Sequence, residues 1–550
     1  MNALVPLPVL LPLCATGLSL AFGTRLGRFQ RFISVAVLSA VLALSVILMI
    51  AADRHGPLSV HLGDFAPPLG ITLVADRLSG LMLTVSSAVT LCVLVYSLGQ
   101  GMTDRDKETP LAVFHPAYLI LVAGVSCTFL AGDLVNLYVG FEIMLVASFV
   151  LLTLGGTGPR MRAGSTYVII SLFSSMLFLT AIAMTYAATG TANFAQLAGR
   201  LADLPIGVQT LIQALLLTVF AIKAAVFPLA AWLPDSYPTA PAPVTAVFAG
   251  LLTKVGVYCM LRTETLLFPG NRLGDLLMAI ALASMVIGIL GAVAQTDLKR
   301  LLSFTLISHI GYMVFGIGLA TREAYGGAIV YVAHHITVQT TLFLVAGLIE
   351  RRGGTTELTR LGGLARAAPM LAVLFFVPAM NLAGIPPLSG FIGKLGLMRA
   401  GVADGGGWAW LLVAGSAATS LLTLYVVAKV WNLAFWRAAP PGQAAAGTVL
   451  ESGDDSDDDA DAGPDRIRGT GDEGITPAHR PAGAAAGATL HGRAVITTSR
   501  LPRPMVVATA ATIGIGLAFT VFADPLTAFT DRTAAELLQR TPYVQEVLGR

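Results

Sequence analysis

Fourteen apolar stretches, each long enough to cross a lipid bilayer, dominate this sequence of 550 residues. A transmembrane helix needs about 20 mainly apolar residues to cross a hydrocarbon core of about 30 Å. Only 12% of the residues are charged, whereas soluble domains carry roughly 25%. The stretches cover residues 3–22, 31–52, 71–98, 113–131, 134–154, 165–189, 207–231, 242–261, 273–294, 301–320, 325–349, 369–398, 407–435 and 504–523. The sequence therefore predicts an all-α polytopic membrane protein with about 14 transmembrane helices.

Positively charged residues predict the orientation of the chain, because Lys and Arg are enriched in cytoplasmic loops. The first stretch has no Lys or Arg before it, unlike a cleaved signal peptide, and is followed by Arg25, Arg28 and Arg31. With the N-terminus outside, the predicted cytoplasmic loops hold 20 of the 34 Lys and Arg residues, and the outer loops and tail hold nine. We expect a multi-pass protein of the cell membrane with its N-terminus outside.

Residues 438–502 differ from the rest of the chain, since Ala, Gly and Pro surround a run of aspartates there. This segment has no apolar period, so we predict a disordered acidic cytoplasmic loop, and we favour a solvated insertion over a regulatory role. The four cysteines lie in apolar stretches without a C-x-x-C pair, and no basic patch with interleaved aromatic residues occurs. We therefore expect no metal site, no cofactor and no nucleic-acid partner.

Five ionisable residues lie deep inside apolar stretches: Glu142, Lys223, Lys254, His335 and Lys394. A charge at the centre of a transmembrane helix costs about 2.5–3.5 kcal/mol on insertion scales. Residues that bear this cost usually face a polar interior and mark an ion or proton pathway. An alternative is a set of structural ion pairs that only hold neighbouring helices together.

Two other histidines are weaker candidates for the same pathway. His334 and His335 are adjacent, so they point about 100° apart on a helix and only one of them can face a given path. His309 lies nearer to a membrane edge. Asp76 and Arg77, at the start of the third stretch, are expected at the membrane interface.

Prolines accompany two of the lysines. Pro228 lies five residues after Lys223, and Pro386 and Pro387 lie shortly before Lys394. Proline removes a helical hydrogen bond and clashes with the preceding turn. In a membrane the freed backbone groups must be satisfied by protein or by water in a cavity. We therefore predict broken helices at the seventh and twelfth stretches, each beside a buried charge.

Lys223 and Lys394 occupy the same place in two successive groups of five stretches, the fourth in each. Because five is odd, the two groups would cross the membrane in opposite senses and form an inverted repeat. Interrupted helices at matching places in two halves point to a transport path near the midplane. The predicted organisation is helices 1–3 in 1–110, the first repeat in 111–265, the second in 266–437, the acidic loop in 438–502, and helix 14 with a short tail in 503–550.

Four longer strings extend this pattern: FEIMLVASFVLLTLGG, AIKAAVFPLAAWLPDSYPTAPAPVTAVFAGLLTKVGVY, QTDLKRLLSFTLISHIGYM and NLAGIPPLSGFIGKL. With them, residues 70–436 resemble the antiporter-like subunits shared by Mrp multisubunit cation/proton antiporters and respiratory complex I. In detail, the sequences of these strings are most similar to the D-type subunit of the Mrp group. The resemblance implies 14 helices with two inverted five-helix repeats and broken helices 7 and 12.

The resemblance also implies roles for single residues. Gln339 stands where many members of the family have a lysine, so a relay step there would fall to His335 and water. The helix-5 glutamate, helix-7 lysine, helix-8 lysine, helix-11 histidine and helix-12 lysine of the family match Glu142, Lys223, Lys254, His335 and Lys394.

The expected function is proton translocation along the membrane midplane, in a D-like subunit of a monovalent cation (Na⁺)/proton antiporter. Such a chain is a secondary transporter rather than an enzyme. The expected partners are other membrane subunits, including a larger antiporter-like one, together with protons, Na⁺ and membrane lipid. The main alternative is a proton-pumping membrane subunit of complex I or a related membrane hydrogenase, in which another subunit supplies the redox driver. A second alternative is a membrane scaffold subunit.

Overall fold

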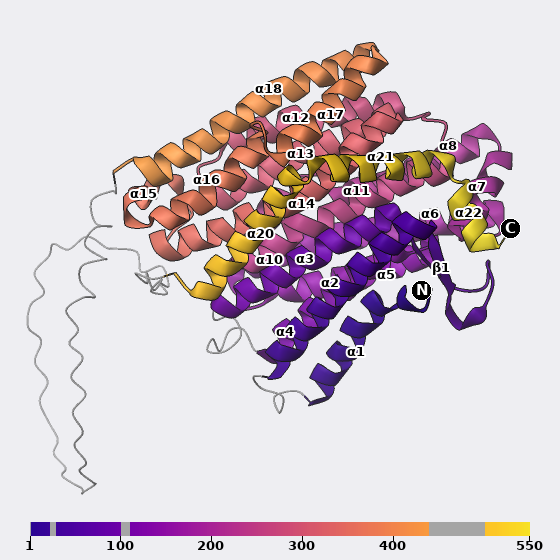
Figure 1. Cartoon of the computed structure of the whole chain (residues 1–550), viewed down its shortest axis with the longest axis horizontal. Helices are drawn as coiled ribbons and strands as arrows, with labels where there is room; N and C mark the ends of the chain where they lie inside the picture. The colour runs from indigo at the N-terminus through magenta and orange to yellow at the C-terminus, as the bar shows by residue number, and fades with distance from the viewer. Residues whose placement is uncertain (1, 23–28, 101–110, 439–500, 550) are drawn as a thin grey trace, which may run out of the picture.

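The computed structural model describes residues 2–22, 29–100, 111–438 and 501–549, which form an almost entirely helical bundle (Figure 1). Within these residues, 13 helical segments are long and apolar enough to cross a membrane. The remaining predicted stretch, 369–398, is divided between two shorter helices. The prediction of an all-α polytopic fold with about 14 spans is therefore confirmed. The predicted acidic loop lies almost wholly outside the described residues.

The elements follow the order of the apolar stretches. The first part of the chain contains α1 (Leu7–Phe22), α2 (Phe29–His55), β1 (Leu58–His61), β2 (Thr72–Ala75), α3 (Arg77–Gln100), α4 (Leu111–Leu130), α5 (Leu134–Thr153) and α6 (Gly158–Thr189). The next part contains α7 (Phe194–Arg200), α8 (Ile206–Ala224), α9 (Leu233–Ser236), and one continuous helical run of α10 (Ala242–Val247), η6 (Phe248–Leu252), α11 (Thr253–Arg262) and η7 (Thr263–Leu267).

The second half of the bundle also consists of long helices joined by short segments. It contains α12 (Gly274–Ala294), α13 (Leu298–Leu319), α14 (Arg322–Gly353), α15 (Leu364–Ala367), α16 (Pro369–Ala383), α17 (Ser389–Asp404), α18 (Gly407–Val430) and η9 (Trp431–Trp436). The chain ends with α20 (Arg503–Val521), α21 (Ala523–Gln539) and α22 (Thr541–Leu548).

Two helical segments form the centre of the bundle, because their apolar windows are completely buried. They are α14 and the run Ala242–Leu267, and both lie in the middle of the molecule in Figure 1. By contrast, α2 and α20 bury only 28% of theirs, as expected for helices whose outer faces contact lipid or another subunit. The central pair carries Lys254 and His335, so the fold buries these two residues away from the surface of the bundle.

Both predicted helix breaks are present. Helix α8 ends at Ala224 because Ala225 adopts a left-handed conformation with φ of 57°, and Pro228 follows in the irregular connection to α9. Helix α16 ends at Ala383 because Gly384 has φ of 84°, and α17 begins only after the two prolines, Pro386 and Pro387. The prediction of broken helices 7 and 12 is confirmed.

A small antiparallel hairpin was missed by the all-helical prediction. Strands β1 and β2 pair with Leu58 opposite Ala75 and His61 opposite Thr72. Each strand has only four residues, too few for an alternating pattern to stand out between two long apolar stretches. The hairpin, α22 and the start of α1 lie at the same end of the bundle, which we call the hairpin face (Figure 1).

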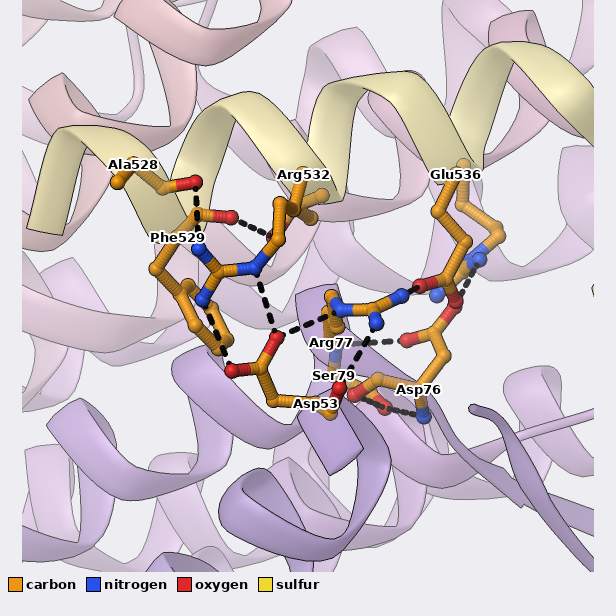
Figure 2. A network of polar contacts seen from close by, with 10 residues as sticks. Asp53, Asp76, Arg77, Ser79, Ala528, Phe529, Arg532 and Glu536 are labelled. Atoms are coloured by element: carbon orange, nitrogen blue, oxygen red, sulfur yellow. Dashed lines mark hydrogen bonds and ion pairs between the residues drawn. The ribbon is translucent and has the colours of Figure 1, made fainter. Parts of the chain in front are cut away.

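The predicted short tail after helix 14 folds as two helices. Helix α21 lies along α14 at the hairpin face, and α22 contacts α7 and β1 (Figure 1). A network of charged side chains attaches α21 to α2 and α3 (Figure 2). Arg77 of α3 contacts Glu536 of α21 and donates to Asp53 of α2 at 2.9 Å, and Arg532 of α21 pairs with Asp53 at 2.8 Å.

Asp76 is buried within the protein, whereas Arg77 remains partly exposed. Asp76 is 1% exposed and pairs with Arg262 of α11 at 2.6 Å between Nη1 and Oδ2. Both partners are buried, so each satisfies a charge that would otherwise be costly in an apolar interior. A single sequence carries no signal that joins two charges 186 positions apart (262 − 76).

Glu536 makes the attachment of α21 dependent on pH. Burial, helped by the nearby Asp76 carboxylate, raises the pKa of Glu536 from 4.5 to about 7 despite the opposing effect of Arg77. Between pH 4.5 and about pH 7, Glu536 is therefore mostly protonated when α21 is docked and mostly ionised when α21 is released. Its docking free energy falls as the pH rises through this window.

We expect hydrogen exchange in α21, corrected for its intrinsic pH dependence, to speed up between about pH 5 and about pH 8. Glu536→Gln should remove this pH effect, because the side chain no longer titrates. Asp524→Asn, at an exposed position of the same helix, should keep it. Protection of α21 that is unchanged over this range in the unmodified protein would contradict the prediction.

Candidate functional site

The five predicted pathway residues come from five different spans. Glu142 lies on α5, Lys223 in the last turn of α8, Lys254 at the start of α11, His335 midway along α14, and Lys394 near the start of α17. Lys254 and His335 are fully buried and Lys394 is 4% exposed, whereas Glu142 and Lys223 are half-buried. The fold thus collects the predicted residues in the interior of the bundle.

Lys223 lies beside a small cavity near the break in α8. Aromatic residues from α5, α6 and the broken segment line much of this cavity, which also includes Ser171. The Lys223 Nζ donates to the Ser171 carbonyl and to the Ser175 hydroxyl, both at 3.4 Å, and lies 5.6 Å from the centroid of the Phe141 ring. These long contacts leave room for water and for a change of partner.

Glu142 is the residue after Phe141 and belongs to the same region. In the described part of the chain it forms no ion pair with Lys223 within 4.0 Å, and its buried Oε1 has no hydrogen-bond partner. A carboxylate oxygen that is buried without a donor is a costly arrangement. Water, or the Lys223 ammonium group after a movement of its side chain, could supply the missing hydrogen-bond donor.

Lys254 is satisfied by an irregularity of its own helix. Its Nζ donates at 2.6 Å to the carbonyl of Ala249, which lies five residues earlier in the π-helical segment η6. Single π-helical turns interrupt the regular helical hydrogen bonding and occur often at functional sites. The buried ammonium group thus obtains an acceptor without leaving the central helix.

Three histidines gather between Lys254 and the second helix break. The rings of His335 and His309 have centroids 5.2 Å apart, and neither ring nitrogen of His335 has a partner in the described part of the chain. His309 Nδ1 lies 2.6 Å from the Tyr331 hydroxyl, and His334 Nδ1 lies 3.0 Å from the Ser389 hydroxyl. His309 therefore lies in the same cluster as His335, deep in the bundle rather than near an edge.

Lys394 uses the end of a broken helix. Its Nζ donates to the carbonyls of Leu382 and Ala383 at 3.2 and 3.0 Å, in the last turn of α16. The unpaired carbonyls and the negative end of the helix dipole favour a cation at this position. The same Nζ lies 5.0 Å from the centroid of the Tyr312 ring.

Two tyrosines complete the cluster, and neither was among the predicted site residues. Tyr331 and Tyr312 have ring centroids 5.3 Å apart and connect the histidines with Lys394. Tyr312 is also within hydrogen-bond distance of Thr419 on α18, at 2.6 Å. Buried aromatic residues in apolar helices look like ordinary core. The only available signal was the spacing of His309 and Tyr312, which puts both on one helix face.

Gln339, one helical turn after His335, is buried as well. Its Nε2 donates to the Leu302 carbonyl at 2.8 Å, and its Oε1 has no partner in the described residues. Within the described chain, no hydrogen bond links Lys223 to Lys254 or Lys254 to His335. A proton moving between these groups would therefore need water or side-chain movement.

The segment that contains all five predicted pathway residues also matches a known protein family. Residues 131–423 match the family model described as NADH:quinone oxidoreductase/Mrp antiporter, TM. The chain belongs to this family. It is 42% identical over 440 residues to a protein from Alkalihalophilus pseudofirmus that is named as the D subunit of an Na(+)/H(+) antiporter, an alignment covering 79% of this chain and 87% of that protein. With 13 helical segments among the described residues that are long and apolar enough to cross a membrane, the chain is a multi-pass membrane protein.

Solved structures give the same result for the fold. The chain is similar to a chain in the Mrp complex from a Dietzia species, with a TM-score of 0.83, 31% identity and full coverage of both chains. It is also similar to a chain of respiratory complex I from Thermus thermophilus, with a TM-score of 0.70, 97% of this chain and 99% of that chain covered. At 23% identity, the second likeness shows the fold alone.

Tyr331 provides a test of the histidine cluster. Tyr331→Phe removes the hydroxyl that contacts His309, at a cost of about 1–3 kcal/mol if the histidine nitrogen is left unsatisfied. We expect ion transport by the assembled protein to fall several-fold, because the ring of His309 loses its orienting partner. Tyr118→Phe, which removes another buried hydroxyl far from the cluster, should cost similar stability but leave transport unchanged. Equal effects of the two variants on transport would contradict the prediction.

Proposed function

We propose that this chain is the D-type, proton-translocating subunit of a multisubunit Na⁺/proton antiporter. The observation that carries the proposal is the row of buried lysines and histidines through the centre of a chain that belongs to the antiporter family. The identity to a relative named as the D subunit of an Na(+)/H(+) antiporter adds to it. The chain is then a secondary transporter subunit and takes its ion-exchange partners from a larger assembly.

The proton path in this proposal runs along the midplane from Lys223 through Lys254 and the histidine cluster to Lys394. Lysine and histidine side chains can each accept and release a proton, and the tyrosine hydroxyls can pass one on. Water fills the steps at which no direct hydrogen bond exists. His309 joins His335 in the cluster, while His334, held by Ser389, has a positioning role.

Glu142 controls the first step. When its carboxylate approaches Lys223, the opposite charge favours the ammonium form. When the two side chains separate, Lys223 is left in a mostly apolar cavity with only long contacts, and release of its proton is favoured. The long contacts that Lys223 makes with Ser171 and Ser175 correspond to the separated state.

The proposed setting is the cell membrane, with the hairpin face and the N-terminus outside. The proposed partners are other membrane subunits, including a larger antiporter-like subunit, with Na⁺ and protons as the transported ions and lipid around the bundle. The weakly buried faces of α2 and α20 provide surface for lipid or for these subunits.

Substitutions at the first step test the path. Glu142→Ala and Lys223→Ala should each lower Na⁺-driven proton movement in vesicles by more than about a hundredfold, while assembly persists. Lys429→Ala is the matched control. Lys429 lies near the end of α18 and donates to the carbonyls of Val293 and Gln295, so its loss should leave transport intact.

The same experiment separates a transporter from a scaffold. A scaffold subunit predicts that Glu142→Ala and Lys223→Ala lower the amount of assembled complex while each remaining complex exchanges ions at the normal rate. That result, or normal antiport in both variants, would overturn the proposed path.

Partner identity tests the antiporter itself. Purification of the tagged chain from native membranes in mild detergent should bring down several small hydrophobic proteins and one larger antiporter-like subunit, as judged by mass spectrometry. Flavin and iron–sulfur subunits in the same preparation would instead identify a proton-pumping subunit of complex I or of a membrane hydrogenase.

A further inference from the structure

A buried carboxylate outside the proposed path lies near the hairpin face. Glu264 belongs to the π-helical segment η7 at the end of the central run and is 3% exposed. It follows Lys254 by ten residues in a continuous helical run, so it lies about 15 Å closer to the hairpin face. In the sequence this residue stands just beyond the eighth apolar stretch, and it was not among the predicted site residues.

Glu264 differs from Asp76 and Glu536, two other buried carboxylates at this end, because a neutral partner holds it. Gln213 of α8 donates from Nε2 to both carboxylate oxygens, at 3.0 and 2.9 Å. Asp76 and Glu536, by contrast, pair with Arg262 and Arg77. In the described part of the chain no lysine or arginine lies within ion-pair distance of Glu264. A buried carboxyl group without a positive partner is favoured in its neutral, protonated form.

Gln213 can serve both protonation states of Glu264. Its amide offers donors on Nε2, which now bind the carboxylate, and an acceptor on Oε1. That Oε1 is buried, with the residue 1% exposed, and has no partner among the described residues. Rotation of the amide by half a turn would let Oε1 accept the hydroxyl of a protonated Glu264. The unused acceptor therefore points to a carboxyl group that gains and loses a proton.

Gln213 also lines a pocket on the hairpin face with a volume of about 210 Å³. The pocket includes Gln209 and Gln213 on α8, residues that follow η7, and Arg540 at the junction of α21 and α22. Glu264 is not among its lining residues, so Gln213 separates the carboxyl group from the pocket. A polar pocket of this size can hold water, and the Gln213 side chain lies between such water and Glu264.

The surrounding charged groups are engaged elsewhere. Arg272 donates to Gln209 at 2.8 Å, and Arg540 donates to the carbonyls of Ala198 and Leu266 at 3.4 Å. Arg262, two residues earlier, is paired with Asp76. Tyr325 of α14 also lies near Glu264 and is itself buried. None of these groups supplies a fixed positive charge that would keep Glu264 ionised.

We propose that Glu264 is a proton-binding site that exchanges protons with the aqueous side at the hairpin face through Gln213 and the adjacent pocket. When the Gln213 side chain turns, a hydronium ion from the pocket reaches the Glu264 carboxylate, gives it a proton and leaves as water, and in the reverse step water takes the proton from the acid and leaves as hydronium. Gln213 then offers Nε2 to the carboxylate or Oε1 to the acid. Resting on the proton translocation proposed above, this site would give the first half of the chain an opening at the hairpin face.

Carbodiimide labelling of the purified complex tests protonation directly. Dicyclohexylcarbodiimide adds to a protonated carboxyl group in apolar surroundings and leaves a stable adduct that mass spectrometry can locate. We expect the peptide containing Glu264 to be labelled several-fold more at acid than at alkaline pH. Glu350, which is 42% exposed and paired with Lys299 at the opposite end of the bundle, should stay unlabelled. An intact complex in which Glu264 is unlabelled at every pH would overturn the proposal.

Variants test the route and the role in transport. Ala202→Trp fills the pocket from an exposed position and should slow labelling of Glu264 several-fold without unfolding the chain. Glu264→Gln should lower Na⁺-driven proton movement by at least about tenfold in assembled complexes, whereas Glu350→Gln should not. Normal transport by assembled Glu264→Gln would overturn the site. Absence of transport by the unmodified complex would instead defeat the proposed function, with the labelling result still standing.

Discussion

A lysine ammonium inside an apolar bundle needs oxygen acceptors, and a regular helix has none to offer, because its carbonyls are already bonded within the helix. The irregular positions of this fold supply them. Lys394 binds the last carbonyls of α16, which the break after Ala383 leaves free. Lys254 binds the Ala249 carbonyl in a π-helical segment. Lys223 lies in the last turn of α8, where the helix dipole favours a cation. Charges and helix irregularities therefore occur together for one physical reason.

The two central helices, α14 and the run Ala242–Leu267, pack closely at a glycine. An added Cβ at Gly250 would lie 2.1 Å from the hydroxyl of Thr340 on α14, so only glycine permits this close approach. The contact lies one turn before Lys254 and one turn after His335. It fixes the two helices at neighbouring levels and thereby brings the buried lysine and the histidine cluster into one layer. At the second break, Gly390 similarly brings α17 against the ring of His334.

The sequence alone was sufficient to predict those features of the fold that depend on a single segment of the chain. Apolar length predicted the spans, and proline beside lysine predicted the breaks at Pro228 and Pro386. Features that join distant segments were missed, because a single sequence gives no pairing information. The Asp76–Arg262 ion pair, the contact of Tyr331 with His309, and the binding of Glu264 by Gln213 are of this kind.

The C-terminal helices were missed for a different reason. Helix α21 is amphipathic and contains several charged residues, so it lacks the apolar length that identified the spans. Its place on the bundle depends on Arg77 and Asp53, which come from the first hundred residues. Local composition can show that such a segment is helical, but only the assembled bundle shows which face it covers.

The histidine cluster limits how much charge the proposed path can hold at one time. With ring centroids 5.2 Å apart, two protonated imidazoles would repel each other by about 3 kcal/mol at an effective dielectric constant of about 20. His309 and His335 therefore cannot easily both be protonated at the same time. Gln339, uncharged and bonded to the Leu302 carbonyl, adds no further charge at this level. In the proposed path, a proton that arrives from Lys254 would therefore repel a proton held by the cluster toward Lys394, and a proton that arrives from Lys394 would repel it toward Lys254.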